Sequence, residues 1–195
     1  MDSERRNAIR TGFIGGASLA LGTHQLSAHA AQDSESKIQD HTAMLELIFV
    51  LRELGNDVCE KAARRIETSL AGSSKVSLHL RNANLSQSQT SQLAEALKGL
   101  TDLNDDRLRS FSMSYNDTLG DTGAVALAQA LPHSLHEIGF VGCGIQDAGG
   151  KAILEWATQA PDLNVLCIED NFFSTETKSL FQVFGESHPA MTLII

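Results

Sequence analysis

The sequence predicts an α/β fold built from repeated strand–turn–helix units, and three observations predict it. Short apolar segments begin at Leu108, Leu135, Leu163 and Met191, and the interval between one start and the next is nearly constant. Within each segment the apolar residues alternate, as in a strand with one buried face. Farther along each unit, apolar residues lie four apart, which places them on one face of a helix.

Each predicted strand has two buried side chains, three and five positions after the start of its unit. These are Leu78 and Leu80, Phe111 and Met113, Ile138 and Phe140, and Leu166 and Ile168. A turn follows each strand. Eight positions after the start of the successive units, this turn contains Ala83, Asn116, Cys143 and Asn171. A turning chain leaves backbone groups unpaired. A buried asparagine amide can satisfy these groups, while cysteine or alanine fills the same place as a small apolar side chain.

The helical half of each unit carries a pair of apolar residues four apart, which we expect on the buried face. The pairs are Leu93 and Leu97, Leu127 and Leu131, Ile153 and Ala157, and Leu180 and Phe184. The unit that begins near Lys75 is longer than the others, since the next unit starts only at Leu108. Because insertions in repeat proteins settle in loops, we expect residues 99–107 to form a longer loop.

Residues 119–140, LGDTGAVALAQALPHSLHEIGF, carry the helix and the next strand in their clearest form. They resemble the leucine-rich repeats of the ribonuclease-inhibitor type, and the resemblance covers about residues 60–195. Strand, asparagine turn, Asp-x-Gly corner and helix recur in register. The resemblance implies a short horseshoe solenoid, with a parallel sheet on the concave side and helices on the convex side. It also implies a protein whose function is binding.

Residues 42–74 precede the repeats of residues 75–195, and their helical pattern predicts a cap followed by half a repeat. The cap stripe is Met44, Leu45, Ile48, Leu51 and Leu54. At the other end, Met191 to Ile195 form a last strand with an apolar edge. Natural proteins normally cover or charge such an edge. This strand is therefore either a contact for a homo-oligomer or an edge whose exposure is tolerated.

Residues 1–30 have the order of a secretory signal peptide, with a basic start, a short apolar run and small residues at the exit. The segment at residues 4–10 resembles a twin-arginine export signal through Arg5 and Arg6, although Glu4 and Ala8 depart from that pattern. Cleavage after Ala30 would leave a disordered linker at 31–41 and no stable membrane insertion. The sequence therefore predicts a periplasmic or secreted protein. The alternative is a cytoplasmic protein with a basic tail.

The formal net charge of -9 and the aromatic content of 5% argue against nucleic acid as a partner, since such binders need basic patches and stacking platforms. The cysteines and histidines lack the spacing of a metal or redox site, and no phosphate-binding loop is present. We therefore expect no cofactor, no metal and no enzymatic activity. One catalytic alternative is a thiol hydrolase that pairs Cys167 with His136 on neighbouring strands.

Side chains on the outward face of the strands are the expected binding surface for another protein. The predicted contact residues are His79, Arg81, Ser112, Ser114, Tyr115, Glu137, Val141, Cys167, Glu169 and Asp170. Their charge changes from basic at the first strand to acidic at the last, which would fix the orientation of a partner. Tyr115 is the expected anchor. We thus predict an adaptor or inhibitor-like binding module, or alternatively a structural protein that self-associates through its C-terminal strand.

Overall fold

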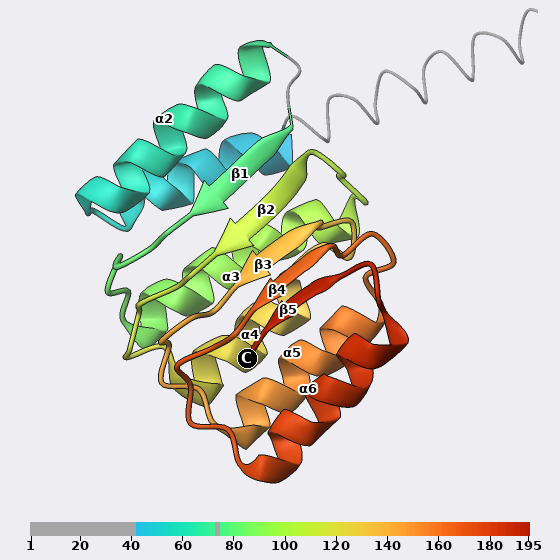
Figure 1. The fold of residues 1–195 in the computed structure, drawn as a ribbon. Coiled ribbons are helices and arrows are strands. Elements are labelled where there is room, and N and C mark those ends of the chain that lie inside the picture. The colour runs from blue at the N-terminus through green and yellow to red at the C-terminus, as the bar shows by residue number, and fades with distance from the viewer. Residues whose placement is uncertain (1–41, 73–74) are drawn as a thin grey trace, which may run out of the picture. The chain divides into compact units, whose positions relative to one another are not determined.

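The computed structural model describes residues 42–72 and 75–195 of the chain (Figure 1). The signal peptide predicted at 1–30 and the linker predicted at 31–41 lie outside the described residues. The described part begins with helical residues 42–53 and continues with the elements that follow. They are α2 (Asp57–Ala71), β1 (Val76–His79), α3 (Gln87–Asp102), β2 (Leu108–Ser112), α4 (Gly120–Ala130), β3 (Glu137–Gly139), α5 (Asp147–Thr158), β4 (Val165–Cys167), α6 (Thr175–Ser187) and β5 (Thr192–Ile194).

The strands form one parallel sheet in the order β1-β2-β3-β4-β5, so each strand pairs with the strand of the next repeat. The pairing aligns one apolar residue from every strand in a single row across the sheet. This row consists of Leu78, Phe111, Ile138, Leu166 and Leu193. The parallel sheet of a leucine-rich-repeat solenoid, expected from the period of the sequence, is confirmed.

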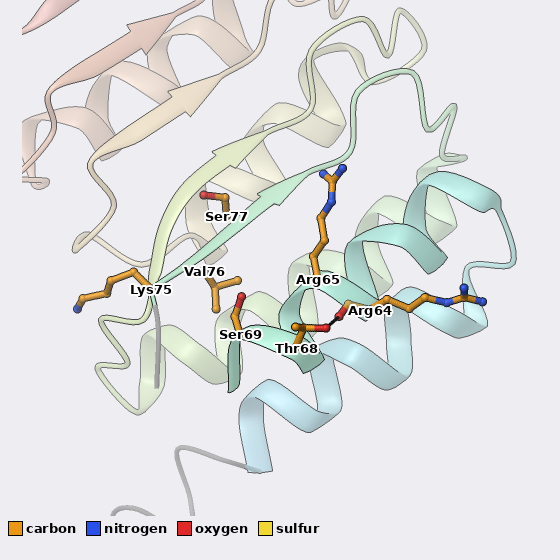
Figure 2. A pocket seen from close by; sticks show the side chains of 7 residues that line it. All are labelled: Arg64, Arg65, Thr68, Ser69, Lys75, Val76 and Ser77. Carbon is orange, nitrogen blue, oxygen red and sulfur yellow. Dashed lines mark hydrogen bonds between the residues drawn. The ribbon is translucent and has the colours of Figure 1, made fainter. Parts of the chain in front are cut away.

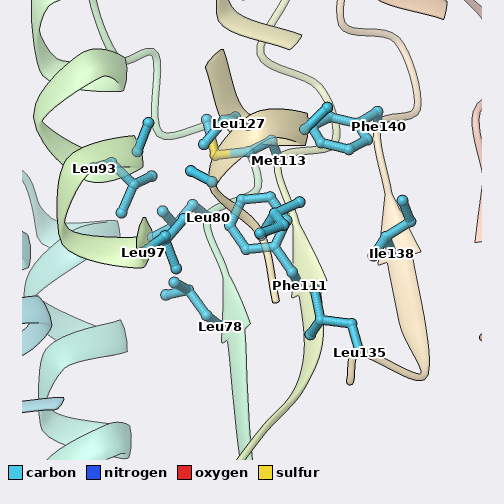
Figure 3. Packing of buried hydrophobic residues seen from close by; sticks show 14 of the residues in the cluster. Leu78, Leu80, Leu93, Leu97, Phe111, Met113, Leu127, Leu135, Ile138 and Phe140 are labelled. Carbon is cyan, nitrogen blue, oxygen red and sulfur yellow. The ribbon is translucent and has the colours of Figure 1, made fainter. Parts of the chain in front are cut away.

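Helices α3 to α6 pack on one face of this sheet, and the row is buried there except at Leu193, which is half-buried (Figure 1). Figure 3 shows how Leu93 and Leu97 of α3 meet Leu78 of β1 and Leu80 just after that strand. The side chains of Phe111 and Phe140 continue the layer, with ring centres 5.9 Å apart. The core is therefore a continuous apolar layer between strands and helices.

The first three helical pairs predicted from the sequence are buried, but in α6 only Phe184 is buried and the prediction for Leu180 is wrong. Leu180 is 42% exposed, and Phe181 is fully buried in its place. Phe181 follows Ile153 by the same interval that separates Leu163 from Leu135, so it occupies the position equivalent to that buried isoleucine. Successive side chains in a helix are rotated by about 100° around its axis. Leu180, the neighbour of the buried Phe181, therefore points away from the core.

Asparagines join neighbouring repeats at the turns, as the sequence predicted. The Asn116 Nδ2 donates to the backbone oxygens of Leu80 (2.9 Å) and Met113, and its Oδ1 accepts from the backbone N–H of Asn84 (2.6 Å). Asn171 makes the same kind of bonds farther along the stack. At the intervening turn the thiol of Cys143 donates to the Met113 oxygen at 3.2 Å. A polar side chain thus satisfies backbone groups of two repeats at once.

The aspartate of each Asp-x-Gly corner caps the helix of the following repeat. Oδ1 of Asp121 accepts from the backbone N–H groups of Gln146 (2.8 Å) and Gly149 (2.9 Å), at the start of α5. Asp147 in turn accepts from the N–H of Ser174 at 2.9 Å, at the start of α6. The first N–H groups of a helix have no partner within it, and a carboxylate there also interacts favourably with the helix dipole.

The extra residues of the first repeat lengthen a helix, contrary to the expected long loop at 99–107. Helix α3 continues to Asp102, and only the residues after it form a connection. In that connection Asp105 is buried and pairs with Arg107, with Nη2 and Oδ2 2.6 Å apart. The ion pair allows a carboxylate to be buried in the loop that leads into β2.

Helical residues 42–53 cover the beginning of the repeats, and this region contributes Met44, Leu47, Ile48, Leu51 and Leu54 to the core. The predicted cap stripe is therefore correct except at Leu45, which is exposed while Leu47 is buried. Hydrogen bonds tie this region to the first repeat. The side chain of Gln89 donates to the backbone oxygen of Leu54 at 3.0 Å, and that of Asn56 donates to the oxygen of Ala83 at 3.3 Å.

Candidate functional site: the open face of the sheet

The sheet face opposite α3 to α6 is covered by no helix within the described residues (Figure 1). A hollow of about 280 Å³ lies on it, and side chains from β1 through β4 and the turns after them line it. Every contact residue predicted from the sequence lines this hollow except Asp170. The hollow is lined by His79, Arg81, Ser110, Phe111, Ser112, Ser114, Tyr115, Glu137, Ile138, Gly139, Val141, Val165, Cys167 and Glu169. Asp170 is exposed at the turn beyond it.

Ser110 also belongs to this face. It lies opposite Glu137 of β3, so it has the same place in its strand as that predicted contact residue. The pairing of β1 with β2 shifts between Val76 and Ser77, because Arg109 is an extra residue in the ladder. The Ser110 hydroxyl is hydrogen-bonded to Nε2 of His79 at 2.8 Å.

Ser114 and Val141 form the floor of the hollow, with exposures of 6% and 7%. The hydroxyl of Ser114 accepts a hydrogen bond from the backbone N–H of Val141 at 3.3 Å and lies 3.1 Å from the hydroxyl of Ser112. The same two hydroxyls would lie 3.1 Å from a Cβ at Gly139. Glycine at this position therefore keeps the hollow open, and these serines hold the floor in place.

Tyr115 forms one wall of the hollow, with 39% of its surface exposed and with Arg81 stacked on its ring. The guanidinium carbon lies 3.9 Å from the ring centre, a cation–π contact that fixes both side chains. Tyr115 has φ of 63°, and the equivalent turn residues Asn82, Gly142 and Asp170 also have positive φ. This conformation is unfavourable for a bulky aromatic residue. The repeated turn thus holds the tyrosine ring over the face.

The other end of the hollow carries negative charge from Glu137 and Glu169, with Cys167 between them along the strands. Burial and the charges of Glu169 and Glu137 raise the pKa of the Cys167 thiol. A nucleophilic cysteine requires the opposite, a lowered pKa. In the hydrolase alternative, His136 would activate this thiol. The ring of His136 is instead hydrogen-bonded to the side chain of Asn164 at 3.1 Å. The geometry does not favour the hydrolase alternative.

A second hollow, of about 470 Å³, lies between α2 and the outer edge of β1 (Figure 2). Its basic side chains do not converge. The Arg64 Nε bonds to Glu60 at 2.8 Å, and the Lys75 ammonium bonds to Asp106 at 2.7 Å. In Figure 2 these two side chains point in opposite directions. The open sheet face is therefore the better candidate for a binding site.

Two further observations bear on the class of the protein. Across residues 42–72 and 75–195, no helix combines the length and the apolar character needed to span a membrane. Over the same ranges, no three His, Cys, Asp or Glu residues come together in a way that could hold a metal ion.

A family model described as Leucine Rich repeat matches residues 108–128 and 132–154. The two matched segments contain β2 with most of α4 and β3 with most of α5. These are the two central repeats, where the inter-repeat bonds of Asn116, Cys143 and Asp121 are found. No curated protein matches the chain at a significant level.

Proposed function

We propose, from the premise that this chain is a leucine-rich-repeat protein, that it is an exported binding module that engages another protein through the open face of its sheet. Leucine-rich repeats generally mediate protein–protein interaction, and solenoids offer extended surfaces for it. The finer assignment is an adaptor or inhibitor-like protein with repeats of the ribonuclease-inhibitor type. In this assignment the chain binds its partner and catalyses no reaction.

The observation that carries the proposal is the hollow on the uncovered face. It brings together an exposed aromatic side chain, a floor of small residues and charges of both signs. Aromatic side chains in partly enclosed sites dominate the energetics of protein interfaces. Because His79 and Arg81 lie at one end and Glu137 and Glu169 at the other, a partner of complementary polarity docks in one orientation.

The binding test uses the protein that co-purifies with the full chain from the producing cell, which is then purified and titrated calorimetrically. Tyr115→Ala should weaken its affinity about tenfold or more, as loss of an interface anchor does. Gln129→Ala, an exposed change on α4 on the helical side, is the matched control and should leave the affinity unchanged. Both variants should retain the melting temperature of the parent. Loss of affinity in Gln129→Ala alone would place the interface on the helices.

Export is the second part of the proposal and rests on the sequence of residues 1–30. The test is the N-terminal sequence of the protein recovered from the producing cell, which should begin after Ala30. Replacing Arg5 and Arg6 by lysine should block processing if the twin-arginine route is used and should leave it intact on the general route. A chain that keeps its initial methionine in the cytoplasm would contradict export.

Self-association is a second candidate function, favoured by the apolar surface at the last repeat. Ile194 of the edge strand β5 is 44% exposed, and Leu180 and Val183 of α6 are also exposed. Two copies can pair such edges and bury these side chains. Size-exclusion chromatography with light scattering should then show a dimer for the parent chain and a monomer for Ile194→Asp. A monomer for both would remove this candidate.

A further inference from the structure

One oxygen of Glu169 is in an unusual position for a carboxylate. Its Oε2 is shielded from solvent, and among the residues that the structure describes it has no hydrogen-bond partner. Removing a carboxylate from water without a partner costs free energy, so a buried unpaired oxygen calls for an explanation. Glu169 also lines the hollow of the sheet face, so a group that enters the hollow meets this carboxylate.

A second carboxylate lies at the same end of the hollow. The strand register pairs Gly139 with Cys167, so Glu137 and Glu169 lie on opposite sides of that cysteine along β3 and β4. Burial and the negative charges of Glu169 and Glu137 raise the pKa of the Cys167 thiol, so both carboxylates lie near this cysteine. Since Gly139 has no side chain, the space above the floor is left open between them.

Within residues 42–72 and 75–195, no basic side chain forms an ion pair with either of these two carboxylates. The basic side chain of Arg81 also lines the hollow, but it is stacked on Tyr115 beyond the serine floor. The negative end of the hollow is therefore uncompensated.

We propose that the partner is anchored by a lysine or arginine side chain that enters the hollow and pairs with Glu169, while Glu137 adds negative charge at the same end. This inference rests on the proposed function and specifies the chemistry of its partner. Ammonium and guanidinium groups donate several hydrogen bonds and carry the opposite charge, so they are suited to the negatively charged end of the hollow. Arg81 at the far end disfavours a second cation there, which orients the partner.

The test is a titration of the isotope-labelled full chain with the peptide acetyl-Gly-Arg-Gly-amide, followed by NMR at the amides of Gly139 and Cys167. The control peptide has citrulline in place of arginine, which keeps the shape and removes the charge. We expect saturable shifts with the arginine peptide and binding at least about tenfold weaker with the citrulline peptide. Equal shifts from the two peptides would overturn the proposal.

Protein variants localise the effect. Glu169→Gln keeps the size of the side chain and should raise the Kd of the arginine peptide about tenfold, with Glu137→Gln giving a smaller increase. The matched control is Glu155→Gln, an exposed change on α5, which should leave the Kd unchanged. An unchanged Kd in Glu169→Gln, with the melting temperature retained, would also overturn the proposal.

The purified partner separates this proposal from the function on which it rests. If Tyr115→Ala weakens partner binding while Glu169→Gln does not, the sheet face remains the interface and the cationic anchor is wrong. If neither variant changes the affinity, the sheet-face function itself is wrong. If both weaken it, both statements hold.

Discussion

The two ends of the repeat stack differ in how their apolar side chains are covered. At the first repeat, helical residues 42–53 place Leu51 and its neighbours fully in the core. At the last repeat, α6 and β5 leave Leu180 and Ile194 substantially exposed. Every unit of a solenoid buries its apolar side against the next unit. The comparison shows that the same repeat is completed at one end by unrelated helices, while at the other its apolar surface stays open to contact.

The largest expected difference between the ends comes from one substitution made at both. Leu51→Ala should lower the free energy of unfolding by about 2–5 kcal/mol, because it leaves a cavity in the core. Leu180→Ala should change it by less than about 0.5 kcal/mol, because the side chain is already exposed to water. Denaturant titrations of both variants measure this. Similar losses for the two leucines would show that α6 is also covered in solution.

The turn asparagines provide a second pair. Asn116→Ala should cost about 2–3 kcal/mol, because the backbone groups that it satisfies are buried. Asn171→Ala, nearer the open end, should cost about 1–2 kcal/mol, because this residue is only half-buried and water can replace its amide. Equilibrium unfolding again gives the values. A larger loss at Asn171 than at Asn116 would reverse the comparison.

The corner aspartates are expected to show a smaller effect of the same kind. Asp121→Ala removes a carboxylate that accepts from two N–H groups and should cost about 1 kcal/mol, as loss of a helix cap does. Asp147→Ala removes one backbone bond and the bonds from the hydroxyls of Thr177 and Ser174, and it should cost less because this carboxylate is exposed to water. Thermal unfolding measures the cost of both substitutions. The control is Asp162→Ala, an exposed change in a loop. The expectation is wrong if Asp121→Ala matches the control.

The smallest expected effect is a pH dependence at the open end. Hydrogen bonds from the backbone N–H of Ser174 and from the hydroxyls of Thr177 and Ser174 lower the pKa of Asp147 from its ordinary value of 3.8. The folded state therefore binds this proton less tightly than the unfolded chain. The stabilisation is present above pH 3.8 and is lost as the pH falls through the lowered pKa. Asp147→Asn should flatten that acidic part of the stability curve, and an unchanged curve would contradict the assignment.

The fold was largely predictable because the nearly constant interval identifies the strands, the turns and their order. The two errors in the helical stripes have a common cause. Leu45 and Leu180 are apolar neighbours of buried residues, and a shift of one position turns a helical side chain by about 100°. Composition alone does not choose between neighbours. The repeat interval does choose Phe181, because counting one repeat onward from Ile153 arrives at that phenylalanine and not at Leu180.

The candidate site was predicted less completely. Ser110 was omitted although it lies opposite Glu137 in the strand register, so a comparison of equivalent positions in neighbouring repeats would have identified it. Alternation along a strand says nothing about depth. Ser114 and Val141 point to the open side but are buried by their neighbours, since the floor of a hollow depends on the heights of side chains on adjacent strands.

Asn116 and Asn171 each bond one repeat back, and this has a consequence for how the protein can change in length. Asn171 reaches the carbonyl of Phe140, and the corner aspartate Asp147 reaches forward to Ser174. A copied block of residues 144–171 inserted after Asn171 carries its own asparagine and aspartate, and it meets the same acceptor and donor on its neighbours. Gene duplication of one unit therefore lengthens the molecule without requiring new kinds of contact between repeats. Each added unit enlarges the binding surface by one strand.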